Sequence, residues 1–187
     1  MFKPLPQQTH QGLKFIHVSS LDDRQKNVTG IIHAFSKAYQ LNKLLTLSIV
    51  GDGANNDELI LLAKQLGSDN AILFKGKLTS EELAQAINEH DALVMFSNYE
   101  TFCLVVAETL ACGKPVITTN VGGIKEYMNT ERGIVVEQNN EVQLTQAFLT
   151  FNPTQFNGSE TRNFALQHFN KNTIVALHNN LYHQVLA

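Results

Sequence analysis

The sequence predicts an α/β protein with a doubly wound, mostly parallel sheet of six strands and helices on both faces. Short apolar runs, each the length of a buried strand, alternate with longer amphipathic runs along most of the chain. Residues typical of helix ends lie between them: Thr79–Glu82 has the pattern of a helix start, and Gly113–Pro115 that of a helix stop. Strict alternation of strands and helices favours a parallel sheet.

The elements follow in order along the chain. The short apolar runs predict strands at Leu13–Val18, Thr46–Val50, Ala71–Phe74, Ala92–Phe96, Val116–Thr119 and Gly133–Val136. The longer runs predict helices at Val28–Gln40, Asp57–Leu66, Ser80–Glu89, Phe102–Ala111, a short piece at Ile124–Met128, Val142–Leu149 and two segments after Ser159.

Composition excludes several classes of protein. The chain has 187 residues, of which 43% are hydrophobic and 17% charged, with a formal net charge of −3. These values fit one compact domain of ~100–200 residues and exclude a disordered chain. The surplus of Lys and Arg that a nucleic-acid binder needs is absent. No apolar run reaches the ~18 residues of a membrane span, and the first residues lack the apolar centre of a secretory signal. We therefore expect a soluble, cytoplasmic domain.

The cysteines and histidines predict neither a disulfide nor a metal site. If Cys103 and Cys112 lie on one helix, nine residues separate them by ~13 Å of axial rise, whereas a disulfide needs Cα atoms within ~7 Å. The seven histidines form no His-Glu-x-x-His or His-x-His pattern, and no Cys-x-x-Cys occurs.

The predicted topology places a binding site before any motif is considered. If the strand order is the common 3-2-1-4-5-6, the order reverses between the first and fourth strands. Ligands of such sheets bind outside the carboxyl ends of the strands at this reversal. Three loops are predicted to line the site: Ser19–Asn27, Ser97–Thr101 and Asn120–Gly123.

Two glutamates follow the fourth strand, and their spacing indicates an elongated ligand. Glu108 is the one charged residue of its predicted helix, so it either faces solvent or is satisfied by a cation or by ligand hydroxyls. Glu100 and Glu108 are up to ~12 Å apart along a helix axis, which does not suit a glycosidase pair at about 5–9.5 Å. The first-turn N–H groups between them favour a phosphate. A sugar, a diphosphate and a ribose would match this layout, which predicts a nucleotide sugar.

Cations and glycines occur in the same loops. Arg24 and Lys26 are either solvated residues beside two aspartates or a source of positive charge for a diphosphate. Gly122 and Gly123 permit positive φ or close approach to a ligand, although a tight turn would use them equally well, and Gly51 is similar. No Gly-x-Gly-x-x-Gly pattern occurs, which argues against a conventional NAD site.

Together these motifs resemble the C-terminal, donor-binding domain of a GT-B fold retaining glycosyltransferase of the group 1 family, a Rossmann-like half of such an enzyme. The resemblance covers nearly all of residues 13–150. The Glu-x7-Glu hallmark of the family is matched by E-T-F-C-L-V-V-A-E from Glu100 to Glu108. Further matching runs are H-V-S-S-L from His17, S-I-V-G-D-G from Ser48, F-K-G from Phe74 and G-G-I-K-E from Gly122.

The resemblance implies a role for each matching position. Glu100 would contact hydroxyls of the donor sugar, Glu108 those of the ribose, and Lys26 the diphosphate. Glu100 and Lys26 would carry catalysis, by electrostatic stabilisation of the leaving group rather than by acid–base chemistry. The main chain of Phe74–Lys77 would meet the base. The implied donor-binding set is Ser20, Arg24, Lys26, Gly51, Lys75, Glu100, Thr101, Phe102, Cys103, Leu104, Glu108, Gly122 and Gly123. No cofactor or metal is expected besides the donor substrate.

Two positions depart from the family pattern. Ser20 stands six residues before Lys26, where the family usually has Arg, and Arg24 is the candidate substitute. Cys103 follows Phe102, where the family usually has Gly.

Transferases of this kind bind the acceptor on a separate N-terminal domain, so the chain is expected to be part of a longer enzyme and inactive alone. Residues 1–12 would be a linker, 13–160 the nucleotide-sugar-binding domain, and 161–187 helices returning toward the other domain. The acceptor would be a glycan, lipid or small molecule, and the bacterial enzyme, at most peripheral to the membrane, would serve polysaccharide or glycoconjugate synthesis. A nucleotide-sugar epimerase or glycosyl phosphorylase of the same fold, and a degenerate binding module, remain as alternatives.

Overall fold

The computed structural model describes residues 1–6 and 9–186, and within them it forms a parallel sheet of order β3-β2-β1-β4-β5-β6. The strands are β1 (Leu13–Ser19), β2 (Leu45–Gly51), β3 (Ile72–Gly76), β4 (Ala92–Met95), β5 (Val116–Thr119) and β6 (Gly133–Val136). The predicted fold class and strand order are therefore confirmed, and the order reverses between β1 and β4 as expected.

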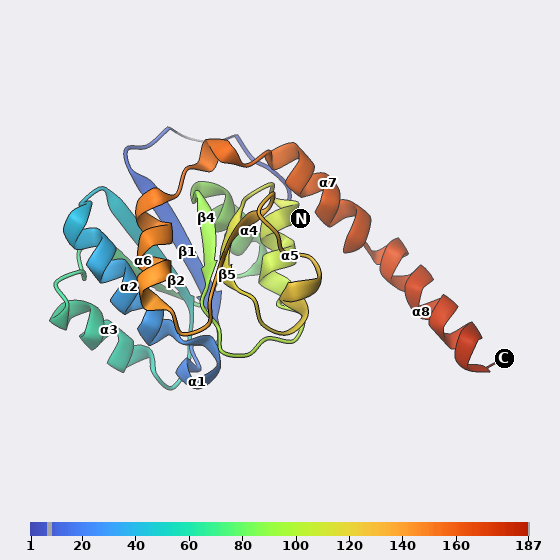
Figure 1. The fold of residues 1–187 in the computed structure, drawn as a ribbon, viewed down its shortest axis with the longest axis horizontal. Coiled ribbons are helices and arrows are strands. Elements are labelled where there is room, and N and C mark those ends of the chain that lie inside the picture. The colour runs from blue at the N-terminus through green and yellow to red at the C-terminus, as the bar shows by residue number, and fades with distance from the viewer. Residues whose placement is uncertain (7–8, 187) are drawn as a thin grey trace.

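Helices cover both faces of this sheet (Figure 1). The α-helices are α1 (Asp23–Lys26), α2 (Val28–Leu41), α3 (Asn56–Gln65), α4 (Ser80–Glu89), α5 (Leu104–Ala111), α6 (Glu141–Thr150), α7 (Gly158–His168) and α8 (Lys171–Leu186). Two short 3-10 helices, η1 (Gly122–Glu126) and η2 (Pro153–Gln155), lie between them. Helices α2, α3 and α6 pack on one face, and α4, α5 and α7 on the other.

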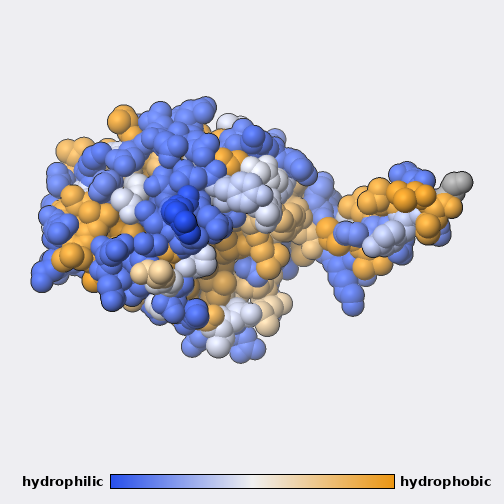
Figure 2. Space-filling model, turned by 90° about the horizontal axis from the view of Figure 1, so that it is seen from below, coloured by the Kyte–Doolittle hydropathy of each residue, from blue (hydrophilic) through white to orange (hydrophobic). Residues whose placement is uncertain are grey.

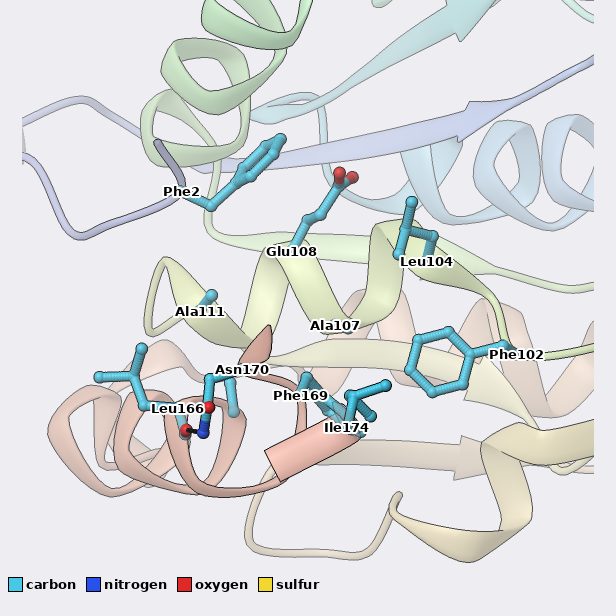
Figure 3. Close-up of a pocket in the computed structure, with 11 residues that line it drawn as sticks. Phe2, Phe102, Leu104, Ala107, Glu108, Ala111, Leu166, Phe169, Asn170 and Ile174 are labelled. Carbon is cyan, nitrogen blue, oxygen red and sulfur yellow. Dashed lines mark hydrogen bonds between the residues drawn. The ribbon is translucent and has the colours of Figure 1, made fainter. Parts of the chain in front are cut away.

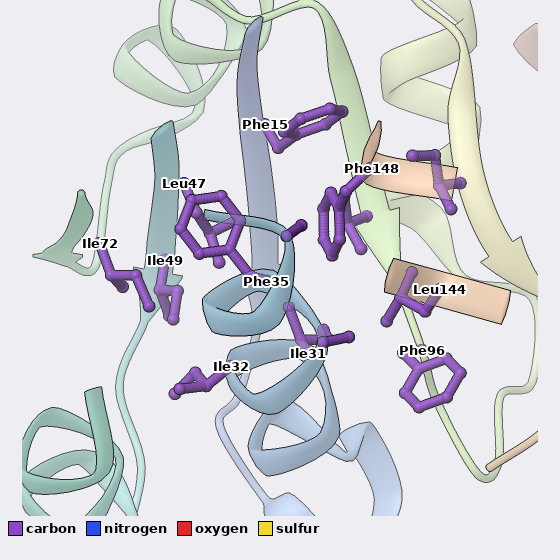
Figure 4. Packing of buried hydrophobic residues seen from close by; sticks show 14 of the residues in the cluster. Phe15, Ile31, Ile32, Phe35, Leu47, Ile49, Ile72, Phe96, Leu144 and Phe148 are labelled. Carbon is purple, nitrogen blue, oxygen red and sulfur yellow. The ribbon is translucent and has the colours of Figure 1, made fainter. Parts of the chain in front are cut away.

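The core has two layers because the strands are buried on both faces. In β1, Phe15 belongs to the layer under α2 and α6, and its neighbour Ile16 to the layer under α5. Phe148 of α6 contacts Phe15 and Phe35 edge-on, with ring centroids 4.9 and 5.5 Å apart (Figure 4). Truncating such a buried ring costs about 3–5 kcal/mol, so these aromatic contacts fix α2 and α6 on the sheet.

Most predicted elements differ from the structure by one or two residues at their ends, and three differences bear on the site loops. The helix expected from Phe102 begins at Leu104. Cys103 adopts a left-handed conformation with φ 59°, which is not helical, so the helix cannot include Cys103 or the residues before it. The loop expected over Ser19–Asn27 contains the short helix α1. The short helix expected at Ile124–Met128 is the 3-10 helix η1, which begins at Gly122.

Helix α8 extends away from the body of the molecule (Figure 1). Figure 2 shows apolar residues along it. Its exposed large apolar side chains are Ile174, Val175, Leu177, Leu181, Tyr182, Val185 and Leu186. Among the described residues, no helix has both the length and the apolar character needed to cross a bilayer.

Candidate functional site

The three loops predicted to line the site come together at the carboxyl ends of the strands. The main-chain N–H of Asn98, after β4, donates to the carbonyl oxygen of Gln25 in α1 at 2.8 Å. The N–H of Gly123, after β5, donates to the carbonyl oxygen of Thr101 at 2.7 Å. The loop after β4 is thus held on both sides by main-chain hydrogen bonds.

A buried ion pair lies where these loops meet. Nζ of Lys26 is 2.8 Å from Oε1 of Glu100, and the two side chains are 17% and 5% exposed. The hydroxyl of Ser97 donates to the same Oε1 at 2.7 Å. A carboxylate bonded in this way is fixed in orientation, and because Lys26 is only partly buried, breaking the pair costs less than the about 3–5 kcal/mol of a fully buried pair. The structure therefore brings together the two residues predicted to carry catalysis.

Local backbone chemistry sets the position of Lys26. Asp22 caps α1 by accepting a hydrogen bond from the N–H of Arg24. Asn27 ends α1 with φ 49°, a left-handed conformation that Asn tolerates, and its side chain then caps α2 by accepting from the N–H of Gly30. Because α1 is bounded at both ends, Lys26 occupies a defined place next to Glu100.

Glycines allow these loops to lie against each other. A Cβ on Gly122, whose φ is +55°, would lie 1.7 Å from the carbonyl oxygen of Glu100, and one on Gly123 would lie 2.5 Å from that of Thr101. A Cβ on Gly51 would similarly lie 1.8 Å from the carbonyl oxygen of Ser19. The close approach expected at these glycines is therefore to the main chain of a neighbouring loop.

Cys103 adopts a left-handed conformation, which a glycine would adopt with less strain. Its side chain is buried in the core layer under α5, and this burial raises the pKa of the thiol to about 12. Both cysteines are free, as expected from their separation. The added side chain fills the core beneath the loop.

Glu108 lies apart from the ion pair. It is half-buried on α5 and lines a cavity of about 500 Å³ whose other walls include Phe102, Leu104, Phe169 and Ile174 (Figure 3). Burial raises the pKa of its carboxyl. No hydrogen bond or ion pair joins its carboxylate to another of the described residues, so Glu108 is a partly desolvated acid without a protein partner.

The remaining predicted residues lie at the edges of this arrangement. The side chain of Arg24 is 94% exposed and is 3.8 Å from Asp22, so it points into solvent. Ser20 is exposed on the loop after β1, and Lys75 is exposed on the edge strand β3. Thr101, Phe102 and Leu104 are exposed on the loop and first turn leading into α5.

Several buried polar residues hold the site and were given no role from sequence. Thr119 Oγ1 donates to the carbonyl oxygen of Ser97 at 2.8 Å, and Tyr127 Oη donates to that of Phe102. His17 is fully buried and hydrogen-bonded through both ring nitrogens. A sequence signal existed for two of them, since His17 and Thr119 are polar residues within apolar strands.

Open parallel α/β sheets bind their ligands outside the carboxyl ends of the strands at the switch point, and the Lys26–Glu100 pair lies there, so the fold and the site define a ligand-binding α/β domain. Residues 6–152 of the chain match the family model described as glycosyl transferases group 1. The chain belongs to this family.

The chain is also similar to a curated relative and to solved structures. The chain is 29% identical over 177 residues to N-acetyl-alpha-D-glucosaminyl L-malate synthase of Bacillus anthracis, covering 91% of this chain and 45% of that protein. It thus spans less than half of that relative. A crystal structure of an S. aureus TarM mutant in complex with UDP, Fondaparinux and alpha-GlcNAc-glycerol has a TM-score of 0.84 at 18% identity, covering 96% of this chain and 38% of that one.

A third match is a domain of similar size. The C-terminal domain of a glycosyl transferase group 1 family protein, LpcC, from Francisella tularensis has a TM-score of 0.76 at 21% identity. The superposition covers 91% of this chain and 96% of that one. At this level of identity the match shows that the two domains share a fold.

Proposed function

We propose that this chain is the C-terminal, donor-binding domain of a retaining glycosyltransferase that takes its sugar from a nucleoside-diphosphate sugar. The observation that carries this proposal is the buried pair of Lys26 and Glu100 at the sheet's switch point, in a chain of the group 1 family. The neighbouring TarM structure holds UDP, which supports a nucleotide as the ligand class.

Lys26 supplies the charge that the reaction needs. When the bond between the anomeric carbon and the diphosphate oxygen breaks, negative charge develops on the diphosphate. The ammonium of Lys26 has three N–H donors, and the bond to Glu100 uses one. The others can bind the diphosphate, assisted by the N-terminus of α5. Because Lys26 and the helix supply positive charge, we propose that no metal is required.

The glutamates take the two ends of the donor. Glu100 uses Oε1 for Lys26 and Ser97, and Oε2 can accept from hydroxyls of the sugar. Glu108 is a half-buried carboxylate without a partner among the described residues, and two ribose hydroxyls would satisfy it. The main chain near Lys75, at the end of β3, would meet the base.

The whole enzyme would contain more than this chain, since the chain covers 45% of its B. anthracis relative. The acceptor, a glycan, lipid or small molecule, would bind on the other domain, so this domain alone would not transfer sugar. We place the enzyme in the cytoplasm, in polysaccharide or glycoconjugate synthesis. The relatives are named as synthases and transferases, which favours transfer over epimerisation.

Calorimetric titration of the chain with UDP, GDP and their sugars tests this proposal. The wild type should bind at least one of them, and Lys26→Ala should abolish binding while Lys26→Arg keeps part of it. Lys37→Ala is a matched control, because Lys37 also pairs with a glutamate, Glu141, at 2.9 Å but is exposed on α2. Absence of heat with every nucleotide at millimolar concentration would refute the proposal, as would equal affinity of Lys26→Ala and Lys37→Ala.

A further inference from the structure

His17, near the carboxyl end of β1, is fully buried and has a defined tautomer. Nδ1 is 2.8 Å from the carbonyl oxygen of Val94 in β4, and Nε2 is 2.8 Å from Oγ of Ser19. A carbonyl oxygen only accepts, so Nδ1 carries the proton, and Nε2 of the neutral ring accepts from the Ser19 hydroxyl. Burial lowers the pKa of His17 to about 4, so the ring stays neutral near pH 7.

The hydrogen-bond chain continues from Ser19 into the loop. Because the hydroxyl proton of Ser19 is donated to His17, Oγ keeps lone pairs free to accept, and the N–H of Leu21 donates to it at 3.1 Å. Leu21 has φ +52°, a conformation that is unfavourable for a residue with a branched side chain. The chain from Val94 through His17 and Ser19 therefore holds the first turn of the β1–α1 loop against its intrinsic preference.

This chain joins the two strands on either side of the switch point. One end is Val94 in β4, three residues before Ser97, which binds Glu100. The other end is the loop that leads into α1 and Lys26. The charges of the ion pair also influence the pKa of His17, which Lys26 lowers and Glu100 raises, although burial has the larger effect.

We propose that His17 is a positioning residue of the donor site, which acts through Ser19 to fix the loop that presents Lys26. The proposal rests on the function proposed above, and His17 itself does not touch the donor. Its neutral ring supplies one donor to β4 and one acceptor to the loop, and no charged side chain could do both.

His90 provides a matched control within the same chain. Its Nδ1 is 2.6 Å from the carbonyl oxygen of Ala86, and its Nε2 is 2.9 Å from Oγ of Ser48. Burial lowers the pKa of His90 to about 4 as well. His90 follows α4 and precedes β4, so it lies at the amino end of the strand whose carboxyl end carries Ser97. Ser19→Ala and Ser48→Ala each remove a hydroxyl bonded to a buried imidazole and differ in their place in the sheet.

The experiment compares Ser19→Ala, Ser19→Thr and Ser48→Ala in the 187-residue chain. Calorimetry with UDP and GDP should show that Ser19→Ala weakens the affinity of the nucleotide that binds wild type by about tenfold, the effect of losing roughly one positioning hydrogen bond. Ser19→Thr keeps a hydroxyl and should restore most of this affinity, and Ser48→Ala should not change it. Hydrogen exchange by NMR should show faster exchange of the Leu21 amide in Ser19→Ala alone.

Each outcome bears on the proposal. Equal affinities of Ser19→Ala and Ser48→Ala, with wild type still binding, would overturn the positioning role and leave the proposed function intact. Unchanged exchange of the Leu21 amide in Ser19→Ala would overturn the hydrogen-bond chain itself. If wild type binds neither UDP nor GDP, nor their sugars, the proposed function falls, and the role of His17 falls with it.

Discussion

Replacing Gly122 by alanine should disrupt the site loops far more than the loss of glycine flexibility explains. At φ +55° any L-residue is strained by about 1–2 kcal/mol. The new Cβ would also lie 1.7 Å from the carbonyl oxygen of Glu100, about half of an ordinary contact distance. Relieving this overlap requires a shift of the loop. The shift would break the hydrogen bond from the N–H of Gly123 to the carbonyl oxygen of Thr101, and losing this bond costs about 1–3 kcal/mol. We expect a total loss of about 2–5 kcal/mol, the sum of the two contributions.

Gly67→Ala separates the two contributions. Gly67 has nearly the same positive φ, +67°, but a Cβ there meets nothing within 4 Å, so only the conformational cost of about 1–2 kcal/mol applies. Urea denaturation of both variants measures the difference, and titration with UDP or GDP should show that affinity is lost only in Gly122→Ala. If the two variants lose equal stability, the close approach of Gly122 to Glu100 does not hold the site together.

Three further results are expected. Lowering the pH from 7 to 5.5 should decrease the free energy of unfolding by about 1 kcal/mol for each of His17 and His90. The pKa of each histidine is about 4 in the folded state and 6.5 in the unfolded state, so the unfolded state takes up protons first and stability is lost as pH falls. His90→Gln should therefore reduce the slope of the urea midpoint against pH. An unchanged slope would contradict this expectation. The pKa of the Cys103 thiol is raised to about 12, so Ellman's reagent at pH 8 should label it only in denaturant, and rapid native labelling would show that the loop opens. Glu108→Ala should weaken nucleotide binding and leave the melting temperature nearly unchanged, because no partner among the described residues is lost; a large melting shift with unaltered affinity would assign Glu108 a structural role.

The sheet and the location of the site could be predicted because each rests on a signal that is local in sequence. Apolar runs of strand length identify the strands, and the usual winding of such sheets places the switch point between β1 and β4. The loops that carry Lys26 and Glu100 follow those strands directly. Their meeting was therefore a consequence of topology and required no knowledge of side-chain contacts.

The details of the site could not be predicted, because they depend on contacts between distant main-chain atoms. Nothing in the sequence marks Cys103 as left-handed, so the helix was expected two residues too early. The sequence allows Gly122 a positive φ, a tight turn or close approach to a ligand; its φ is indeed positive, but the close approach is to the main chain of Glu100, which no sequence signal indicates. His17 was recognised as part of a motif, but the atoms that it joins belong to Val94 and Ser19, and only coordinates reveal that connection.

Glycines beneath neighbouring loops, at Gly51 and Gly122, have a consequence for how this domain can diversify. The framework of the site is backbone resting on backbone, so its shape does not depend on the outward side chains of residues such as Ser20, Tyr99 and Asn120. Side chains at those positions can change in size and polarity while the main-chain framework of the site keeps its shape. One scaffold can thereby present different surfaces to different ligands, so that binding selectivity can change without loss of the fold.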